Sequence, residues 1–128
     1  MSEDTYRQGL DVKRRLFGAG KERPIAHGSL ADDLLRLSDE VAYGRVYTRP
    51  GLDLKTRSML TVAALTVLGR DDYLRRHLQG ALHVGVTPAE IKEILMQMGF
   101  YGGMPVALRA LRIAQEDITA WEAGGRAS

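Results

Sequence analysis

The sequence contains no cysteine among its 128 residues. Without a thiol the chain cannot form disulfides, hold a metal through thiolates, or use a cysteine as nucleophile or redox centre. No stretch approaches the ~18 consecutive apolar residues of a membrane span, and the polar N-terminal segment lacks the apolar core of a signal peptide. We therefore expect a cytoplasmic protein with no membrane partner.

A basic run or stripe is also missing. The net charge is only +2, and the lysines and arginines are scattered along the chain, so we expect no nucleic-acid partner. A small anionic organic ligand needs only one or two well-placed arginines, which this charge balance permits. The length suits one domain with its own core, covering residues 1–128.

No window alternates apolar and polar residues as a half-buried strand does, so we predict an all-α fold of about six helices. Glycine, proline and N-capping residues mark the helix ends. The expected N-caps are Ser29, Asp53, Asp71 and Thr87, and Thr87 begins a capping box with proline at the first helical position. Five of the expected helices cover residues 4–17, 29–44, 54–68, 88–102 and 105–121, and the remaining one is capped by Asp71 and holds His77.

The third expected helix, residues 54–68, is apolar almost all round and should be buried on most sides. The short GRDD connection that follows it predicts an antiparallel hairpin with the fourth helix. Several methionines add to the apolar surface, which exceeds what one small domain can hide. We therefore expect a homo-oligomer.

His77 is the one polar group on an apolar stripe that also contains Leu74, Leu78 and Ala81. The other histidines, His27 and His83, are not spaced to form a helical metal pair with it, and no carboxylate lies at ligand spacing, so we expect no metal site. The stripe alone favours a packed core histidine over a catalyst. Tyr73, four residues earlier, and Ser58, on the facing arm of the hairpin, are candidate partners for a catalytic His77, although both residue types also occur as packing.

Three arginines, Arg45, Arg49 and Arg57, flank the RPGL turn, and a guanidinium is suited to clamp a carboxylate. Arginines near loops are also commonly solvated. Tyr101 lies beside two glycines between helices, where a ligand could approach the backbone closely or where the glycines merely turn the chain.

Together these segments resemble the carboxymuconolactone decarboxylase family over nearly the whole chain. The resemblance implies an all-helical, alkylhydroperoxidase-D-like fold around a central helical hairpin, assembled as a trimer or hexamer. The matching segments, in order, are YRQGLDVKRRLFG (6–18), TRPGL (48–52), TRS (56–58), His77, GALHVGVT (80–87), EIKEILMQ (90–97) and YGGMPVA (101–107).

Peroxidatic relatives in the wider family have a Cys-x-x-Cys before the histidine and a glutamate one helix earlier, where this chain has Arg70, Tyr73 and Ser58. The resemblance therefore does not imply peroxidase chemistry. The true decarboxylases usually have an acidic residue and a tryptophan before RPGL, and a glutamate four before the histidine. This chain has Arg45, Tyr47 and Tyr73 there.

The resemblance implies a cofactor-independent decarboxylase of a γ-carboxymuconolactone-like lactone in aromatic catabolism. His77 would transfer the proton, with Tyr73 and Ser58 as the other catalytic candidates. The alternatives are a lactone or enol isomerase, a decarboxylase of a larger secondary metabolite, and a non-enzymatic ligand-binding protein. The substrate-binding candidates are Arg45, Arg49, Arg57, Tyr47 and Tyr101.

Overall fold

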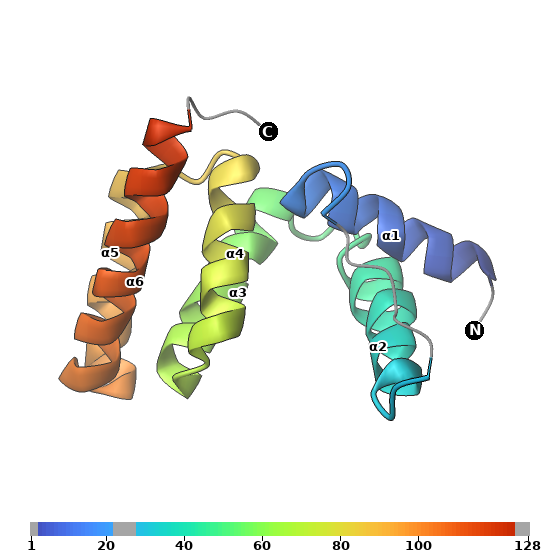
Figure 1. The fold of residues 1–128 in the computed structure, drawn as a ribbon, viewed down its shortest axis with the longest axis horizontal. Coiled ribbons are helices and arrows are strands. Elements are labelled where there is room, and N and C mark those ends of the chain that lie inside the picture. Colours follow the sequence, from blue (N-terminus) through green and yellow to red (C-terminus); the bar gives the residue numbers. More distant parts are fainter. Residues whose placement is uncertain (1–2, 22–27, 125–128) are drawn as a thin grey trace. The chain divides into compact units, whose positions relative to one another are not determined.

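The computed structural model describes residues 3–21 and 28–124. All regular structure in these ranges is helical, as predicted (Figure 1). The chain divides into two compact units, residues 1–54 and 55–128. No helix within the two described ranges combines the length and hydropathy that a membrane span requires. The elements are α1 (Glu3–Phe17), α2 (Asp32–Leu37), η1 (Ser38–Val46), α3 (Leu54–Leu68), α4 (Asp71–His83), α5 (Pro88–Gly102) and α6 (Met104–Ala123).

The N-terminal unit is built on close packing between α1 and η1. A Cβ added to Gly9 would lie 1.9 Å from the carbonyl oxygen of Asp39, and one added to Gly44 would lie 2.2 Å from that of Thr5. The two backbones can approach this closely only because both positions are glycine. Gly9, inside a predicted helix, and Gly44 therefore mark the crossing of α1 and η1. Gly44 was predicted to end its helix, which instead continues to Val46.

The second predicted helix differs from the observed one at both ends. Ser29 does not cap it: its Oγ accepts from the Ala31 amide, while the Asp32 carboxylate accepts from the amides of Gly28 and Ser29. The α-helix begins at Asp32 and changes to a π-helix at Ser38. The Ser29 hydroxyl and the Asp32 carboxylate thus bond amides that precede the helix, and in these bonds neither side chain caps an amide of α2.

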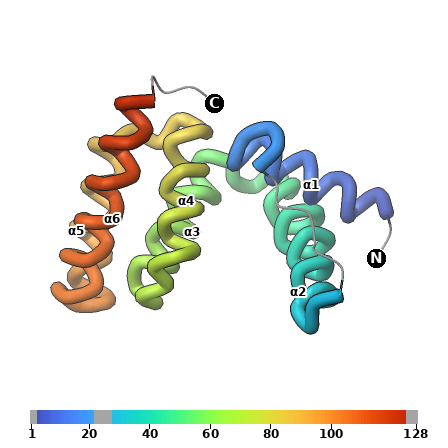
Figure 2. The backbone as a smooth tube through the Cα atoms, in the orientation of Figure 1, coloured from blue at the N-terminus to red at the C-terminus, as the bar shows by residue number. Residues whose placement is uncertain are grey.

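The C-terminal unit begins with the predicted hairpin of α3 and α4. The backbone trace reverses direction between them (Figure 2), at Gly69, whose φ of 68° suits glycine. Asp71 is the first residue of α4 rather than its cap, which is Arg70. The Asp71 carboxylate instead accepts a 2.7 Å hydrogen bond from Arg109 on α6. The predicted cap is thus one residue too late in the sequence.

The predicted capping box of α5 is confirmed. The Glu90 amide donates to Thr87 Oγ1 at 3.1 Å, and the Thr87 amide donates to the Glu90 carboxylate at 2.9 Å. α5 then ends at Gly102, and Gly103, with φ 101°, turns the chain into α6. The sixth helix starts and ends slightly outside its predicted bounds.

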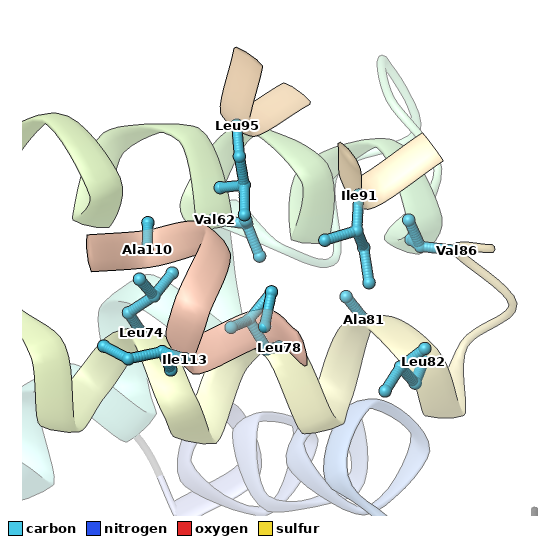
Figure 3. Close-up of a cluster of buried hydrophobic side chains, with 11 residues drawn as sticks. Val62, Leu74, Leu78, Ala81, Leu82, Val86, Ile91, Leu95, Ala110 and Ile113 are labelled. Carbon is cyan, nitrogen blue, oxygen red and sulfur yellow. The ribbon is translucent and has the colours of Figure 1, made fainter. Parts of the chain in front are cut away.

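The core of this unit lies among α3, α4, α5 and α6 (Figure 3). On α3, Ser58, Val62 and Thr66 are buried, whereas Leu60 and Leu68 are 55% and 63% exposed. In the single chain, therefore, α3 is not buried on most sides as its composition predicted. The core side chains are Val62, Leu74, Leu78, Ala81, Leu82, Val86, Ile91, Leu95, Ala110, Ile113 and Ala114.

Candidate functional site

His77 lies on the buried face of α4, with 6% of its surface exposed. Its neighbours on that face, Leu74, Leu78 and Ala81, are core residues. The apolar spacing that makes α4 amphipathic therefore also carries the imidazole into the protein interior, as the sequence pattern predicted.

Burial, together with a smaller effect of the positive charge of Arg76, lowers the pKa of His77 from 6.5 to about 4. Desolvation disfavours the imidazolium, and a neighbouring cation disfavours it again. At neutral pH the side chain is thus a neutral imidazole, which has one N–H donor and one acceptor nitrogen. The uncharged imidazole can accept a proton at one nitrogen, which makes it a cation, or donate a hydrogen bond from the other nitrogen.

Ser58 is fully buried on α3, and its Oγ makes no hydrogen bond within residues 3–21 and 28–124. It lies one turn before Val62, which packs in the same core cluster as Leu78, the neighbour of His77. A buried hydroxyl with no partner costs free energy. Both Ser58 and His77 are therefore polar groups inside a largely apolar interior.

The other candidates of the C-terminal unit are more exposed. Tyr73 and Tyr101 are 60% and 74% exposed in the single chain. Arg57, immediately before Ser58 on α3, is half-buried. The structure thus places Arg57, Ser58, Tyr73 and His77 in one unit, on the two arms of its hairpin, with Tyr101 at the end of α5.

Arg45, Tyr47 and Arg49 belong to the N-terminal unit. Arg45 is exposed near the end of η1, and Arg49 is exposed just after it. Tyr47 is half-buried and its ring lies 5.0 Å from that of Tyr43, centroid to centroid.

No group of three His, Asp or Glu side chains suited to a metal occurs in the described ranges. His83 is half-buried at the end of α4. His27 lies outside the described residues.

Sequence reasoning missed two ion pairs, each of which contains a buried carboxylate. Lys13 Nζ donates to Asp39 Oδ1 at 2.8 Å in the N-terminal unit. In the C-terminal unit Arg75 donates to Asp117, a residue that is 7% exposed, at 2.9 Å. Both pairs join residues far apart in the sequence, so no local spacing reveals them. The helix-interior glycines were the one available signal for the first pair.

Grooves open between helices in the described part of the C-terminal unit, and the two described next are not lined by His77 or Ser58. One, of about 440 Å³, lies between α5 and α6. The other, of about 600 Å³, is lined by Met59 from α3 and by Ile94, Met96 and Phe100 from α5. Their largely apolar linings suit packing better than the binding of a small anion.

The sequence pattern of the carboxymuconolactone decarboxylase family matches residues 32–116. A 4-carboxymuconolactone decarboxylase of Acinetobacter baylyi is 36% identical over 116 residues, which make up 89% of this chain and 87% of that protein. A nitrosuccinic acid decarboxylase of Metarhizium robertsii is 35% identical over 123 residues, 84% of this chain and 85% of that protein. An uncharacterised 15.0 kDa protein of Paracoccus denitrificans is 44% identical over 78 residues, 59% of this chain and 58% of that protein.

Proposed function

The chain belongs to the carboxymuconolactone decarboxylase family, and we propose that it is a carboxy-lyase that removes CO2 from a small dicarboxylic acid with its own electron acceptor. γ-Carboxymuconolactone is the first substrate to test. The observation that carries this proposal is a buried, neutral imidazole, His77, in a chain similar to two named decarboxylases.

The two acids named for the relatives share one chemical feature. When γ-carboxymuconolactone loses CO2, the electron pair of the broken C–C bond spreads through the ring double bond into the lactone carbonyl. In nitrosuccinic acid, one carboxylate is attached to the same carbon as the nitro group. When that carboxylate leaves as CO2, the nitro group can take up the electron pair of the broken C–C bond. Each acid therefore carries its own electron sink, and the protein needs no cofactor for that task.

The protein must instead hold the carboxylates, stabilise the anion and deliver a proton to carbon. With its pKa lowered to about 4, His77 is uncharged before substrate binds. A bound dicarboxylate favours the imidazolium, because an opposite charge nearby raises the pKa of histidine. His77 thus takes up a proton as substrate binds, passes it to the carbanion after CO2 leaves, and recovers a proton from solvent in the next cycle.

We assign carboxylate binding to Arg45, Arg49 and Arg57, since guanidinium groups pair with carboxylates in a planar, two-bond geometry. Tyr47 and Tyr101 are assigned as further substrate contacts. These roles are supported by the family resemblance and by the side-chain chemistry.

Ser58 and Tyr73 complete the assignment as hydroxyl donors. Tyr73 is proposed to donate to the lactone carbonyl, where negative charge develops. Among the described residues the Oγ of Ser58 has no hydrogen-bond partner, which supports a role for it, because a buried hydroxyl that serves only packing is normally hydrogen-bonded.

A second candidate reaction keeps the same acid–base residues. Arg45, Tyr47 and Tyr73 stand where the decarboxylases usually have two acids and a tryptophan, and this change in charge favours a different or larger substrate. The chain would then isomerise a lactone or enol, or decarboxylate a larger secondary metabolite. Proton transfer by His77 is common to both candidates.

We also propose a cytoplasmic homo-oligomer, a trimer or hexamer, with residues 1–128 acting as one domain. Its support is the apolar surface of the single chain: Phe100 is 86% exposed and Leu60 55%. Phe100→Glu places a charge on that surface and is expected to lower the mass measured by light scattering. A monomeric wild-type protein at micromolar concentration would contradict the oligomer.

The activity is tested by CO2 release from γ-carboxymuconolactone and from nitrosuccinic acid, measured with the purified protein after dialysis against a chelator. We expect release from at least one acid, and loss of that release in His77→Ala. Isomerised product without CO2 would select the second candidate. Activity restored only by added metal would contradict the role given to His77.

A further inference from the structure

The buried ion pair of the N-terminal unit joins α1 to η1. Lys13 Nζ lies 2.8 Å from Asp39 Oδ1, and the two side chains are 10% and 3% exposed. Desolvation offsets much of the attraction in such a pair, so a well-packed apolar pair would stabilise the fold about as well. We therefore explain the presence of this ion pair by the way it fixes α1 against η1, and not by a gain in folding stability.

A series of contacts leads from this pair to Tyr47. The Lys13 ammonium lies 5.6 Å from the centre of the Tyr43 ring, within the range of a cation–π interaction. The Tyr43 ring packs edge-on against Phe17, with centroids 6.4 Å apart, and in a tilted arrangement against Tyr47, with centroids 5.0 Å apart. Lys13 and Phe17, both on α1, thus hold the Tyr43 ring, and Tyr43 supports the ring of Tyr47.

The backbone beneath these rings is a π-helix. The Tyr47 amide donates to the Ala42 carbonyl at 2.9 Å, five residues back. Such segments are rare and are frequent at functional sites. The Asp39 carbonyl is itself fixed against Gly9 of α1, so α1 holds η1 through both backbone and side chain.

We propose that Lys13 and Asp39 are positioning residues that fix the ring of Tyr47 for substrate binding. The inference rests on the proposed function, because Tyr47 is a substrate contact only under that proposal. A misplaced Tyr47 phenol weakens substrate binding, and the proton-transferring imidazole of His77 is unaffected. Loss of the ion pair should therefore raise KM while kcat changes little.

The test uses four variants. Lys13→Met removes the cation but leaves a buried carboxylate, which can prevent folding. The double variant Lys13→Met/Asp39→Leu removes both charges and keeps the interior filled. Lys13→Arg keeps a cation at this position. Arg14→Met, which removes an exposed ion pair with Asp11 on the same helix, is the matched control.

The first readout needs no substrate. Protein labelled with 3-fluorotyrosine has five tyrosine signals at most, and Tyr47→Phe identifies the signal of Tyr47 by 19F NMR. We expect this signal to shift and sharpen in the double variant and to stay in place in Arg14→Met. In Lys13→Arg, which keeps the cation, it should lie closer to the wild-type position than in the double variant. The second readout is steady-state decarboxylation, with KM about tenfold higher in the double variant and kcat within about twofold of wild type.

An unchanged Tyr47 signal in the double variant would overturn the inference while leaving the proposed function intact. A shifted signal with unchanged KM would also overturn it, and would remove Tyr47 from the substrate contacts. If wild-type protein decarboxylated neither acid, the proposed function would fail, and the substrate role of Tyr47 with it. The 19F signal would then still decide whether the ion pair positions the ring.

Discussion

The lowered pKa of His77 predicts a specific dependence of stability on pH. In the folded chain the pKa is about 4, against 6.5 for the ordinary side chain. Between these values the unfolded chain binds a proton that the folded chain excludes, so acid favours unfolding. The contribution of the neutral His77 to the free energy of unfolding is fully present above pH 6.5 and is lost as the pH falls towards 4. A difference of about 2.5 in pKa corresponds to about 3 kcal/mol in the free energy of unfolding.

Comparison with His77→Gln isolates this contribution, because glutamine does not titrate and other groups are common to both proteins. Denaturant unfolding of both is followed from pH 8 to pH 4 at one protein concentration. We expect the wild type to lose up to about 3 kcal/mol more than the variant over that range. Parallel curves for the two proteins would refute the argument, since His77 would then keep an ordinary pKa in the folded chain.

Three further predictions concern stability and the site. Thr87→Ala removes the capping box of α5 and should cost about 1 kcal/mol in thermal or denaturant unfolding; no loss would mean that the cap contributes nothing. Gly44→Ala pushes a Cβ to 2.2 Å from the Thr5 carbonyl oxygen and should cost about 3 kcal/mol, whereas Gly51→Ala, with open space around it, should be near neutral; equal effects would contradict the close crossing. Ser58→Ala removes a buried hydroxyl without a partner, so its melting temperature should equal or exceed that of wild type while CO2 release falls; a fully active variant would make Ser58 a packing residue.

Helix positions could be predicted because apolar spacing and local caps are properties of adjacent residues. The capping box at Thr87 is an example, since all of its groups lie within four residues. Ser29 and Asp71 were wrong as caps because each has a competing partner: Asp32 bonds the local amides, and Arg109, on another helix, binds Asp71. The π-helix was not predictable, because its nine residues lack a pattern that separates it from an α-helix.

The candidate site was predictable only in part. The burial of His77 follows from the stripe of leucines around it. Its lowered pKa does not, because it depends on desolvation by the folded core and on the charge of Arg76. The pair of Lys13 and Asp39 is 26 residues apart, and only the folded N-terminal unit brings it together.

The central claim is that His77 transfers the proton that replaces CO2. The most direct measurement is the rate of CO2 release per folded molecule of His77→Gln, with the folded fraction taken from its melting curve at the same pH. We predict a fall of about 10²-fold or more, with the oligomer retained. A destabilised variant that releases CO2 at the wild-type rate per folded molecule would contradict the claim and would make His77 a core residue.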